Sequence, residues 1–445
     1  MSSWIKVKLS DVTTKIGDGL HGTPKYDENG EYYFINGSNL LNGKIVIIDE
    51  SKRVSKDEFL KYQKELNDRT ILVSINGTLG NIAVYNSENI VLGKSVCYLN
   101  VIFNVNRDYI RYILSSGLFQ EYIHREATGS TIKNVSLKMM RNFEFSLPEI
   151  ETQNYIVEVL GCLDKKIQLN TQINQTLEQI AQTIFKSWFI DFDPVHAKAN
   201  ALASGQAAEQ ATQAAMAVIS GKNTQELHRL QTANPEQYQQ LWEIAEAFPS
   251  GFSGYKNLGE IPIGWNVLTF KDFISESKEK IGSLEDVPEY SVGNEGIYPR
   301  SEKYNKSLSK TPEKNKVVRI GDLVFGMGSK TLNWGIMNDE IGSVSPAYFV
   351  YRIFTNINYI YLNKYIKAKE YDFQNLIKPT SRQGQSVDKE MFLKKEIYVP
   401  NEYLLNIYLN KLKEIDSLVY SYTTEVLILE QIRDELLPKL LSGEI

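Results

Sequence analysis

The feature that most constrains how this chain can fold is an internal repeat. When Pro148 is aligned with Pro400, 252 positions later, the residues that follow match without a gap. The segment Leu177–Ile180 reads Leu-Glu-Gln-Ile, and so does Leu429–Ile432 at the same offset. Matches in register over so long a run indicate a duplicated supersecondary unit. The sequence therefore predicts two similar halves that end in the same element.

The repeated element is a long helix, predicted over 148–196 in the first half and 400–445 in the second. In each helix, apolar residues recur at alternating short spacings, which is typical of the seam of a coiled coil. About 40 helical residues make a rod of roughly 60 Å, longer than one small domain covers. We therefore expect the two helices to pair antiparallel, although two ordinary core helices would give the same pattern. The predicted seam consists of Ile156, Leu160, Leu163, Ile167, Leu177, Ile180, Ile184, Trp188, Tyr408, Leu412, Ile415, Val419, Tyr422, Val426, Leu429 and Ile432.

A β-rich region precedes each helix, at 1–147 in the first half and 262–399 in the second. Runs such as Thr70–Ile75, Asn81–Tyr85 and Asp322–Phe325 are rich in strand-forming residues, and Asn-Gly pairs mark turns. The two β-rich regions match each other only loosely, whereas the helices match closely. The predicted class is α+β: two mixed α/β domains joined by two long antiparallel helices, with a pseudo-twofold internal repeat.

Residues 197–261, between the halves, form an insert of different composition. The first part is rich in Ala and Gln, which are good helix formers, and we expect helices there. The stretch Pro249–Gly264 contains several glycines and prolines. Such residues are typical of a linker, and this stretch is predicted to connect the insert to the second half.

Composition favours a globular protein without a membrane span or a disulfide framework. The 445 residues are 42% hydrophobic and 23% charged, and no run approaches the about 18 apolar residues that a membrane span requires. The residues from Met1 to Lys6 lack the basic and apolar regions of a signal peptide. Two cysteines in unlike contexts, Cys97 and Cys162, suit a reducing compartment, so we expect a cytoplasmic protein. The net charge of −5 means that any contact with DNA would need local positive charge.

The sequence gives little support for catalysis. It has no Gly-x-x-x-x-Gly-Lys-Ser/Thr phosphate loop and no His-Glu-x-x-His metal pair, and its four histidines lie in separate segments. The segment Asp191–Pro194 is superficially similar to the motif by which amino-methyltransferases hold adenine, but it lacks the second proline. We therefore predict no catalytic residue, no metal site and no cofactor bound by this chain.

Binding is better supported, because polar segments occur at corresponding places in both halves. The segment 128–134 lies just ahead of the first long helix, and 380–386 just ahead of the second. Two hairpin tips and the loop 19–25 carry similar side chains, of types that hydrogen-bond base edges and phosphates. Solvated surface loops would be the plain alternative. The candidate DNA-binding residues are His21, Thr23, Lys25, Asn76, Thr78, Asn81, Ser130, Thr131, Lys133, Asn134, Lys330, Asn333, Arg382, Gln383 and Gln385.

Five motifs give the chain a specific resemblance to a known family. They are Gly129–Asn134, the Leu-Pro pair at 147–148, the helix exit Lys186–Val195, the junction Leu258–Trp265 and the C-terminal segment Leu436–Ile445. In content and order, over essentially the whole chain, they resemble the specificity subunit of type I restriction-modification systems.

The resemblance implies a sequence-specific DNA-binding subunit that recognises a bipartite asymmetric site, with the half-site spacing set by the two helices. It implies double-stranded DNA as a partner, together with two modification subunits that methylate adenine with S-adenosylmethionine, and motor-nuclease restriction subunits. Catalysis would then lie in the partners, because methylation requires the adenine to be extruded into a partner's pocket.

Two departures from the family's pattern stand out. The insert is longer and more biased in composition than the pattern leads us to expect, and Ser381–Gln385 differs from the Gly-Ser-Thr-Ile of the first half. The alternative to a DNA-binding subunit is a protein scaffold, with two β-rich modules on a helical rod and no affinity for DNA.

Overall fold

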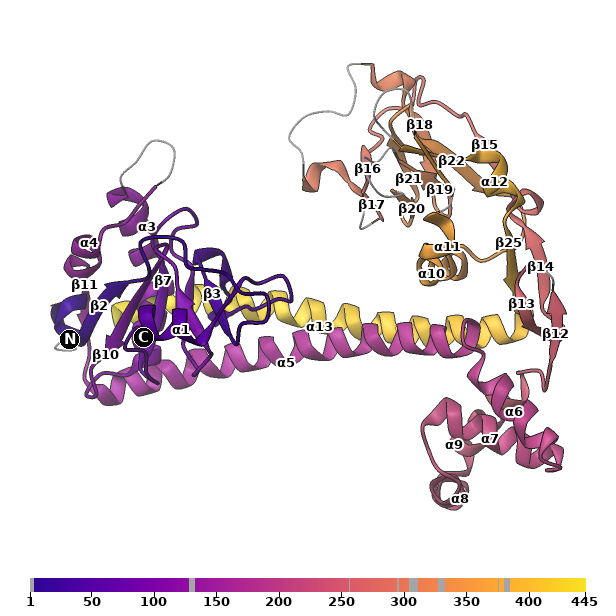
Figure 1. The fold of residues 1–445 in the computed structure, drawn as a ribbon, viewed down its shortest axis with the longest axis horizontal. Coiled ribbons are helices and arrows are strands. Elements are labelled where there is room, and N and C mark those ends of the chain that lie inside the picture. Colours follow the sequence, from indigo (N-terminus) through magenta and orange to yellow (C-terminus); the bar gives the residue numbers. More distant parts are fainter. Residues whose placement is uncertain are drawn as a thin grey trace. The chain divides into compact units, whose positions relative to one another are not determined.

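The computed structural model describes residues 4–127, 133–255, 257–293, 296–303, 311–326, 333–374, 376–379 and 385–445. The chain divides into two compact units, one formed by Met1–Asn174 with Tyr420–Ile445 and the other by Gln175–Val419. Each unit contains a β-rich domain and part of each of two long helices (Figure 1). The predicted α+β class is confirmed.

The β-rich domain of the first unit is built on a four-stranded antiparallel sheet in the order β2-β10-β7-β8. Successive residues of β7 enter two different cores, because side chains alternate between the faces of a strand. Ile71 and Val73 pack with helices α2, α3 and α4, and Leu72 packs on the opposite face with strands β3 and β9. The elements are β1 (Ile5–Lys8), β2 (Thr13–Asp18), β3 (Tyr32–Ile35), β4 (Leu40–Leu41), β5 (Lys44–Ile45), β6 (Arg53–Val54), α1 (Lys56–Tyr62), β7 (Thr70–Ser74), β8 (Ile82–Val84), β9 (Ile90–Leu92), β10 (Val96–Val101), α2 (Arg107–Ser115), α3 (Gly117–Glu126), α4 (Leu137–Asn142) and β11 (Glu144–Leu147).

The β-rich domain of the second unit repeats this plan, with a four-stranded sheet in the order β15-β22-β19-β20. Leu323 and Phe325 of β19 enter one core and Val324 enters the other, as in β7. The elements are β14 (Asn266–Thr269), β15 (Ile274–Ser277), β16 (Tyr290–Gly293), β17 (Gly296–Pro299), β18 (Lys316–Arg319), β19 (Leu323–Phe325), β20 (Trp334–Ile336), β21 (Ile341–Val344), β22 (Phe349–Ile353), α10 (Tyr359–Ala368), α11 (Glu370–Gln374), β23 (Ile377–Pro379), β24 (Gln385–Val387), α12 (Lys389–Lys394) and β25 (Glu396–Val399).

The sequence repeat is also a repeat of individual hydrogen bonds. The Tyr109 hydroxyl of α2 donates to the Ser146 carbonyl at 3.0 Å. In the second domain, Tyr361 of α10, 252 positions later, donates to the Tyr398 carbonyl at 2.8 Å. Both helices begin with an asparagine whose side chain accepts from two backbone amides of the first turn. Because these bonds join the same elements in each domain, the duplication extends beyond the helices into the β-rich domains.

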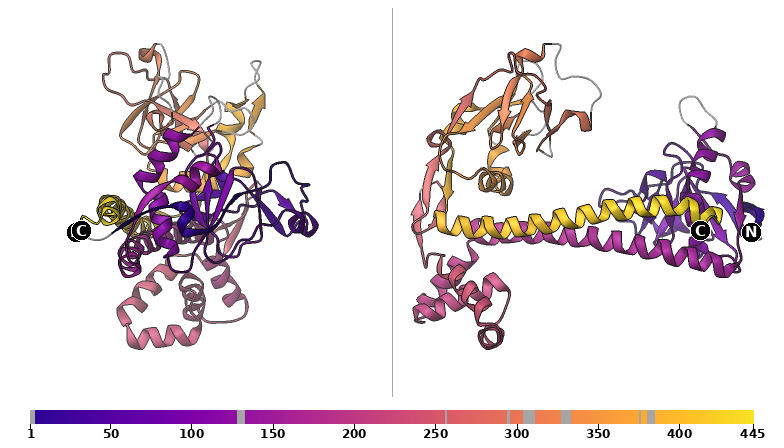
Figure 2. Two further views of the ribbon diagram at one scale, coloured as in Figure 1. Left: turned by 90° about the vertical axis from the view of Figure 1, so that its left-hand side faces the viewer. Right: turned by 180° about the vertical axis from the view of Figure 1, so that it is seen from behind.

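The long helices are α5 (Ile150–Phe189) and α13 (Glu402–Ser442). In the first unit, the start of α5 packs antiparallel on the end of α13 (Figure 2). Asn170 donates to the Glu425 carboxylate at 2.8 Å, and Asn174 donates to the Thr423 hydroxyl at 3.0 Å. Polar pairs inside an apolar seam fix which residues face each other.

In the second unit, the end of α5 packs on the start of α13 through aromatic side chains. The rings of Phe185, Trp188 and Phe189 lie 5.1–6.3 Å from the ring of Tyr408, measured between centroids. Aromatic pairs at these separations contribute packing energy beyond simple burial. The pairing of the two helices expected from the sequence is thus present in both units.

Two predicted seam residues do not lie in the seam. Ile180 and Ile432, which occupy equivalent positions of the repeat, are 43% and 40% exposed, so this part of the prediction was wrong. In α5 the buried position falls one residue later, at Ala181, which is 4% exposed. The reason is geometric: a helix with 3.6 residues per turn drifts from a strict heptad spacing.

The predicted helices of the insert are confirmed, and they form a small bundle with its own core. Met216, Leu227, Tyr238 and Leu241 are buried together. The buried Lys198 donates to the Ala245 and Phe248 carbonyls, at 3.1 and 2.7 Å, and so satisfies carbonyl groups at the end of a helix. The helices are α6 (Asp193–Ala203), α7 (Ala208–Ser220), α8 (Thr224–Ala233) and α9 (Pro235–Glu246).

The stretch predicted to be a linker, Pro249–Gly264, contains a β-hairpin instead. Strands β12 (Phe252–Tyr255) and β13 (Gly259–Pro262) pair antiparallel. Gly259 has φ of +76°, a left-handed conformation that favours glycine. Gly259 therefore lies where the chain turns into β13, and Gly254 lies within β12. Among the described residues, no helix combines the length and apolar character needed to cross a bilayer.

Candidate nucleic-acid interface

One end of the four-stranded sheet in the first unit gathers several loops that carry candidate residues. The register pairs Asp18 with Cys97, Ser74 with Val96, and Val73 with Ile82. The end of β2, the end of β7 and the starts of β8 and β10 therefore lie at the same edge. The loops 19–25, 75–81 and 93–95 leave the sheet there, and we call this edge the loop end.

The predicted hairpin tip and the segment ahead of α4 lie side by side at the loop end. Asn76 and Asn134 form an antiparallel bridge, and the Asn76 amide donates to the Asn134 side-chain oxygen at 3.4 Å. The Gly77 amide donates to the Lys133 carbonyl at 3.3 Å. Thr78, Lys133 and Asn134 are exposed. Two candidate segments far apart in the sequence thus form one polar surface.

Asn81 has a structural role in this arrangement. Its side-chain amide donates to the Gly37 carbonyl at 3.5 Å, and its own carbonyl accepts the Ser74 amide at 2.8 Å. The side chain is only partly exposed. Asn81 therefore closes the base of the hairpin, although its side chain was predicted to contact DNA.

The residues of loop 19–25 fall into two neighbourhoods. His21 leaves the sheet at the loop end and lies 2.6 Å from the Asp18 carboxylate, with 70% of its side chain exposed. The exposed Lys25 donates its backbone amide to Glu58 of α1 at 3.0 Å. Thr23 is exposed between them. Lys25 is thus held beside α1, and only His21 is tied to the edge of the sheet.

Several candidate residues lie outside the described residues: Ser130, Thr131, Lys330, Arg382 and Gln383. Two others are described in part. The Asn333 carbonyl accepts the Gly326 amide at 2.8 Å at the start of the β19–β20 hairpin loop. Gln385 pairs with Pro379 through the backbone of β24 and β23.

The structure adds residues to the loop end that the sequence did not single out. Lys94 is exposed on the turn between β9 and β10. Its neighbour Ser95 donates to the Asn36 side chain at 3.2 Å, and the Gly37 amide donates to Ser95 at 2.9 Å. The run Gly-Lys-Ser between two apolar strands was a local signal for an exposed turn. Its position beside Asn76 was not predictable, because it depends on long-range strand register. Lys94 and Lys133 thus place two exposed lysines at the edge that also carries Asp18, in a chain of net charge −5.

The corresponding edge of the second domain has different side chains. Lys389, at the start of α12, forms an ion pair with Glu276 at 2.9 Å and lies 4.1 Å from the centre of the Phe349 ring. Lys316 donates to the Tyr348 carbonyl at 2.6 Å, and burial lowers the pKa of its amino group. Lys316 and Lys389 are thus engaged with the protein, so the described side chains at this edge differ between the two domains.

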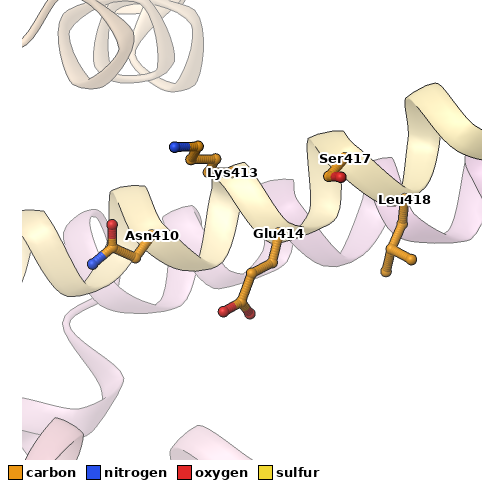
Figure 3. Close-up of a pocket in the computed structure, with 5 residues that line it drawn as sticks. All are labelled: Asn410, Lys413, Glu414, Ser417 and Leu418. Carbon is orange, nitrogen blue, oxygen red and sulfur yellow. The ribbon is translucent and has the colours of Figure 1, made fainter.

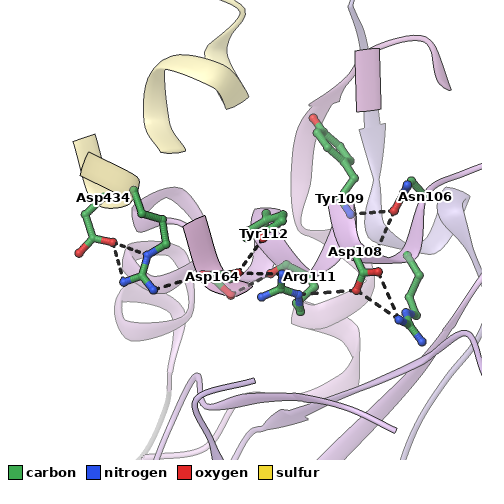
Figure 4. Close-up of polar contacts among 10 residues, drawn as sticks. Asn106, Asp108, Tyr109, Arg111, Tyr112, Asp164 and Asp434 are labelled. Carbon is green, nitrogen blue, oxygen red and sulfur yellow. Dashed lines mark hydrogen bonds and ion pairs between the residues drawn. The ribbon is translucent and has the colours of Figure 1, made fainter. Parts of the chain in front are cut away.

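A cluster of charged residues ties α2 to both long helices within the first unit (Figure 4). The Asp164 carboxylate of α5 accepts bonds from the Tyr112 hydroxyl at 2.7 Å, Arg111 at 3.2 Å and Arg433 of α13 at 3.4 Å. Burial raises the pKa of Tyr112, which keeps its hydroxyl protonated as a donor. The cluster therefore joins the β-rich domain of the first unit to the helices.

The described residues offer no group of histidine, cysteine and carboxylate side chains suited to hold a metal ion. A shallow depression on α13 is lined by Asn410, Lys413, Glu414, Ser417 and Leu418 (Figure 3). All five belong to one helix and surround no enclosed volume, so we assign this depression no role.

Comparison with known proteins identifies the family. A model of the type I restriction modification DNA specificity domain matches residues 1–179. The chain is 30% identical over 488 aligned residues to the specificity subunit of the type I restriction enzyme HindI of Haemophilus influenzae, with all of both chains covered. It is 27% identical over 199 residues to the MjaIX specificity subunit of Methanocaldococcus jannaschii, covering 43% of this chain and 45% of that one.

Among solved structures, the S subunit of a type I system from M. genitalium aligns over 99% of this chain and 96% of its own, with a TM-score of 0.46 and 15% identity. The full-length match to the Haemophilus protein shows the family. This chain belongs to the specificity subunits of type I restriction-modification systems, the non-catalytic subunits that give these complexes their DNA specificity.

Proposed function

We propose that this chain reads a bipartite, asymmetric DNA site, one half-site with each β-rich domain. The observation that carries the proposal is the combination of a repeated framework with unlike loop ends. The framework repeats down to the Tyr109 and Tyr361 hydrogen bonds. In contrast, Lys94 and Lys133 are exposed at the edge of the first domain, whereas the described Lys316 and Lys389 of the second domain bond to other protein groups. Two β-rich domains with the same fold but different surface side chains would bind two half-sites of different sequence.

In the first domain, we propose that Asn76, Thr78, Lys133 and Asn134 contact the DNA together with Lys94. Lysines would bind phosphates and fix the register of the protein on the duplex, and asparagines are suited to hydrogen-bond adenine edges. Because the contacts with phosphates release counterions, binding should weaken steeply as salt rises. We propose that the two DNA-recognition domains span residues 1–147 and 262–399.

The two long helices would set the distance between the half-sites. Each is one uninterrupted element, 40 residues in α5 and 41 in α13, and at 1.5 Å per residue such a helix is roughly 60 Å long. Half-site spacing follows protein geometry in other proteins that bind DNA as pairs of readers.

We propose that the chain binds double-stranded DNA, two methyltransferase subunits and motor-nuclease restriction subunits, and that this complex assembles in the cytoplasm. S-adenosylmethionine would bind to the methyltransferase subunits, which would also extrude the target adenine from the duplex. The chain itself would contribute recognition and assembly.

The experiment is to express the chain with its methyltransferase subunits in cells that lack other adenine methylation, and to map methylated adenines across the genome. The expected result is one motif with two fixed half-sites and a spacer of constant length. A matched control replaces Lys94 and Lys133 with glutamine, which should lower methylation of the whole motif without changing its bases. Methylation without a bipartite motif, or a motif independent of this chain, would contradict the proposal.

A further inference from the structure

The tip of the β7–β8 hairpin is clamped to helix α3 by a single side chain. The Gln120 amide group donates two hydrogen bonds, to the Gly80 carbonyl at 3.0 Å and to the Leu114 carbonyl at 2.9 Å. Gly80 closes the tip that carries Asn76 and Thr78, and its amide returns to the Ser74 carbonyl at 2.9 Å. Gln120 is therefore joined directly to the loop that presents these residues.

The fit between Gln120 and Gly80 is close. Gly80 has φ of +81°, and a Cβ atom added there would lie 2.1 Å from the Gln120 side-chain oxygen. A side chain at position 80 would be strained by the backbone and would also displace Gln120. The β7–β8 hairpin and helix α3 can therefore lie this close together only if residue 80 is glycine.

The other side of the same tip is held by the segment ahead of α4. The Val135 amide donates to the Ile75 carbonyl at 2.9 Å, and Asn76 is bridged to Asn134. Leu79 packs into the domain core. The tip is thus fixed on both sides, and Gln120 provides the side-chain clamp on the α3 side.

In the second domain, a hydrogen bond also joins the corresponding hairpin, β19–β20, to the corresponding short helix, α11. Different residues make this bond. Trp334, the first residue of β20, donates its ring N–H to Glu370 of α11 at 3.3 Å. Trp334 is buried, whereas Glu370 is exposed. A clamp between the hairpin and the short helix therefore recurs, but its chemistry has diverged along with the loops.

We propose that Gln120 is a positioning residue for recognition of the first half-site. It does not contact DNA; it holds the β7–β8 tip at the angle from which Asn76 and Thr78 reach the bases. The inference rests on the proposed function, because it takes the loop end as the DNA-reading surface. A tip that is free to move would discriminate less well between bases at that half-site, and the other half-site would be read as before.

The test uses the full chain assembled with its methyltransferase subunits. The substrate is a DNA library in which each base of both half-sites is changed singly, and methylation rates are measured for every member. In Gln120→Met the side chain has nearly the same size but no donor. We expect about five- to tenfold less discrimination at the first half-site, the order of effect that one or two lost hydrogen bonds produce. Discrimination at the second half-site should stay unchanged.

Four control variants separate positioning from stability. Glu121→Gln changes the exposed neighbour on α3 and should have no effect. Ile113→Val removes one buried methylene from α2 in the same domain, so it lowers stability without touching the clamp, and should not change base discrimination. Glu370→Leu removes the acceptor of the second clamp and should relax only the second half-site, whereas Glu370→Gln keeps an acceptor and should restore it.

Equal relaxation at both half-sites, or a lower overall rate with an unchanged base profile, would overturn the inference for Gln120. So would an effect of Ile113→Val as selective as that of Gln120→Met. These outcomes differ from failure of the proposed function, in which the unmodified chain itself would show no half-site that depends on its first domain.

Discussion

At the residue scale, buried polar groups decide how firmly each core is specified. Two of the buried tyrosines in the core of the second unit have different surroundings. Tyr361 donates to the Tyr398 carbonyl at 2.8 Å. The Tyr408 hydroxyl has no hydrogen-bond partner among the described residues, although its ring packs on three aromatic rings of α5. Burial raises the pKa of both hydroxyls.

These two tyrosines give a matched pair of substitutions. Tyr361→Phe should destabilise the chain by about 1–2 kcal/mol, because a buried hydrogen bond is lost. Tyr408→Phe should leave stability unchanged or raise it slightly, because removing an unpaired buried hydroxyl removes a desolvation cost. Urea unfolding followed by tryptophan fluorescence measures both. A larger loss for Tyr408→Phe than for Tyr361→Phe would contradict this account of the core.

Asp164 of α5 bonds both to α2 of the first β-rich domain and to α13. Asp164→Asn keeps the size of the side chain but removes the charge that faces Arg111 and Arg433. We expect a loss of about 1–3 kcal/mol, the range for hydrogen bonds to charged groups. The control is Arg125→Gln, which breaks a mostly exposed pair with Glu126 and should change stability by less than about 1 kcal/mol. Equal effects of the two changes in thermal unfolding would show that the cluster has no special role.

At the element scale, the sequence predicts the regular elements better than their surroundings. The helices α5 and α13 follow from local periodicity, and the hairpins β7–β8 and β19–β20 follow from β-forming runs flanked by turn residues. The hairpin of β12 and β13 was taken for a linker, because its glycines indicate a turn and a flexible connection equally well. Ile180 and Ile432 were predicted to lie in the seam because the prediction used a strict heptad spacing. An α-helix with 3.6 residues per turn drifts away from that spacing.

The candidate interface was predictable only in part, for a related reason. Asn134 was singled out because polar residues recur ahead of both helices, and Asn76 because it lies at the tip of a predicted hairpin. Lys94 and Gln120 were not singled out, because their positions depend on strand register and on helix α3 packing beside Gly80. Local sequence carries no information on such long-range contacts.

The long helices allow a direct test of the spacing they are proposed to set. Asn174 of α5 faces Thr423 of α13, so four residues inserted after Asn174 and four before Thr423 lengthen both helices by about one turn, ~5.4 Å. The spacer of the methylated motif should grow by about one to two base pairs, at roughly 3.4 Å per base pair. The half-sites should keep their bases. Altered half-sites with an unchanged spacer would show that the helices do not set the distance.

At the scale of the whole molecule, the chain is one framework used twice with different surfaces. The paired helices and the two four-stranded sheets recur, whereas the loop ends and the insert of α6–α9 do not. Such a design lets recognition change in one domain without disturbing the other. We therefore propose that each β-rich domain alone determines one half-site.

The most direct measurement replaces residues 4–147 with a second copy of residues 265–399, at the positions where Trp4 corresponds to Trp265 and Leu147 to Val399. Methylated adenines are then mapped in cells that express this chain with its methyltransferase subunits. We expect a symmetric motif, made of two inverted copies of the half-site that the second domain is proposed to read. A motif that still contained the original first half-site would contradict it.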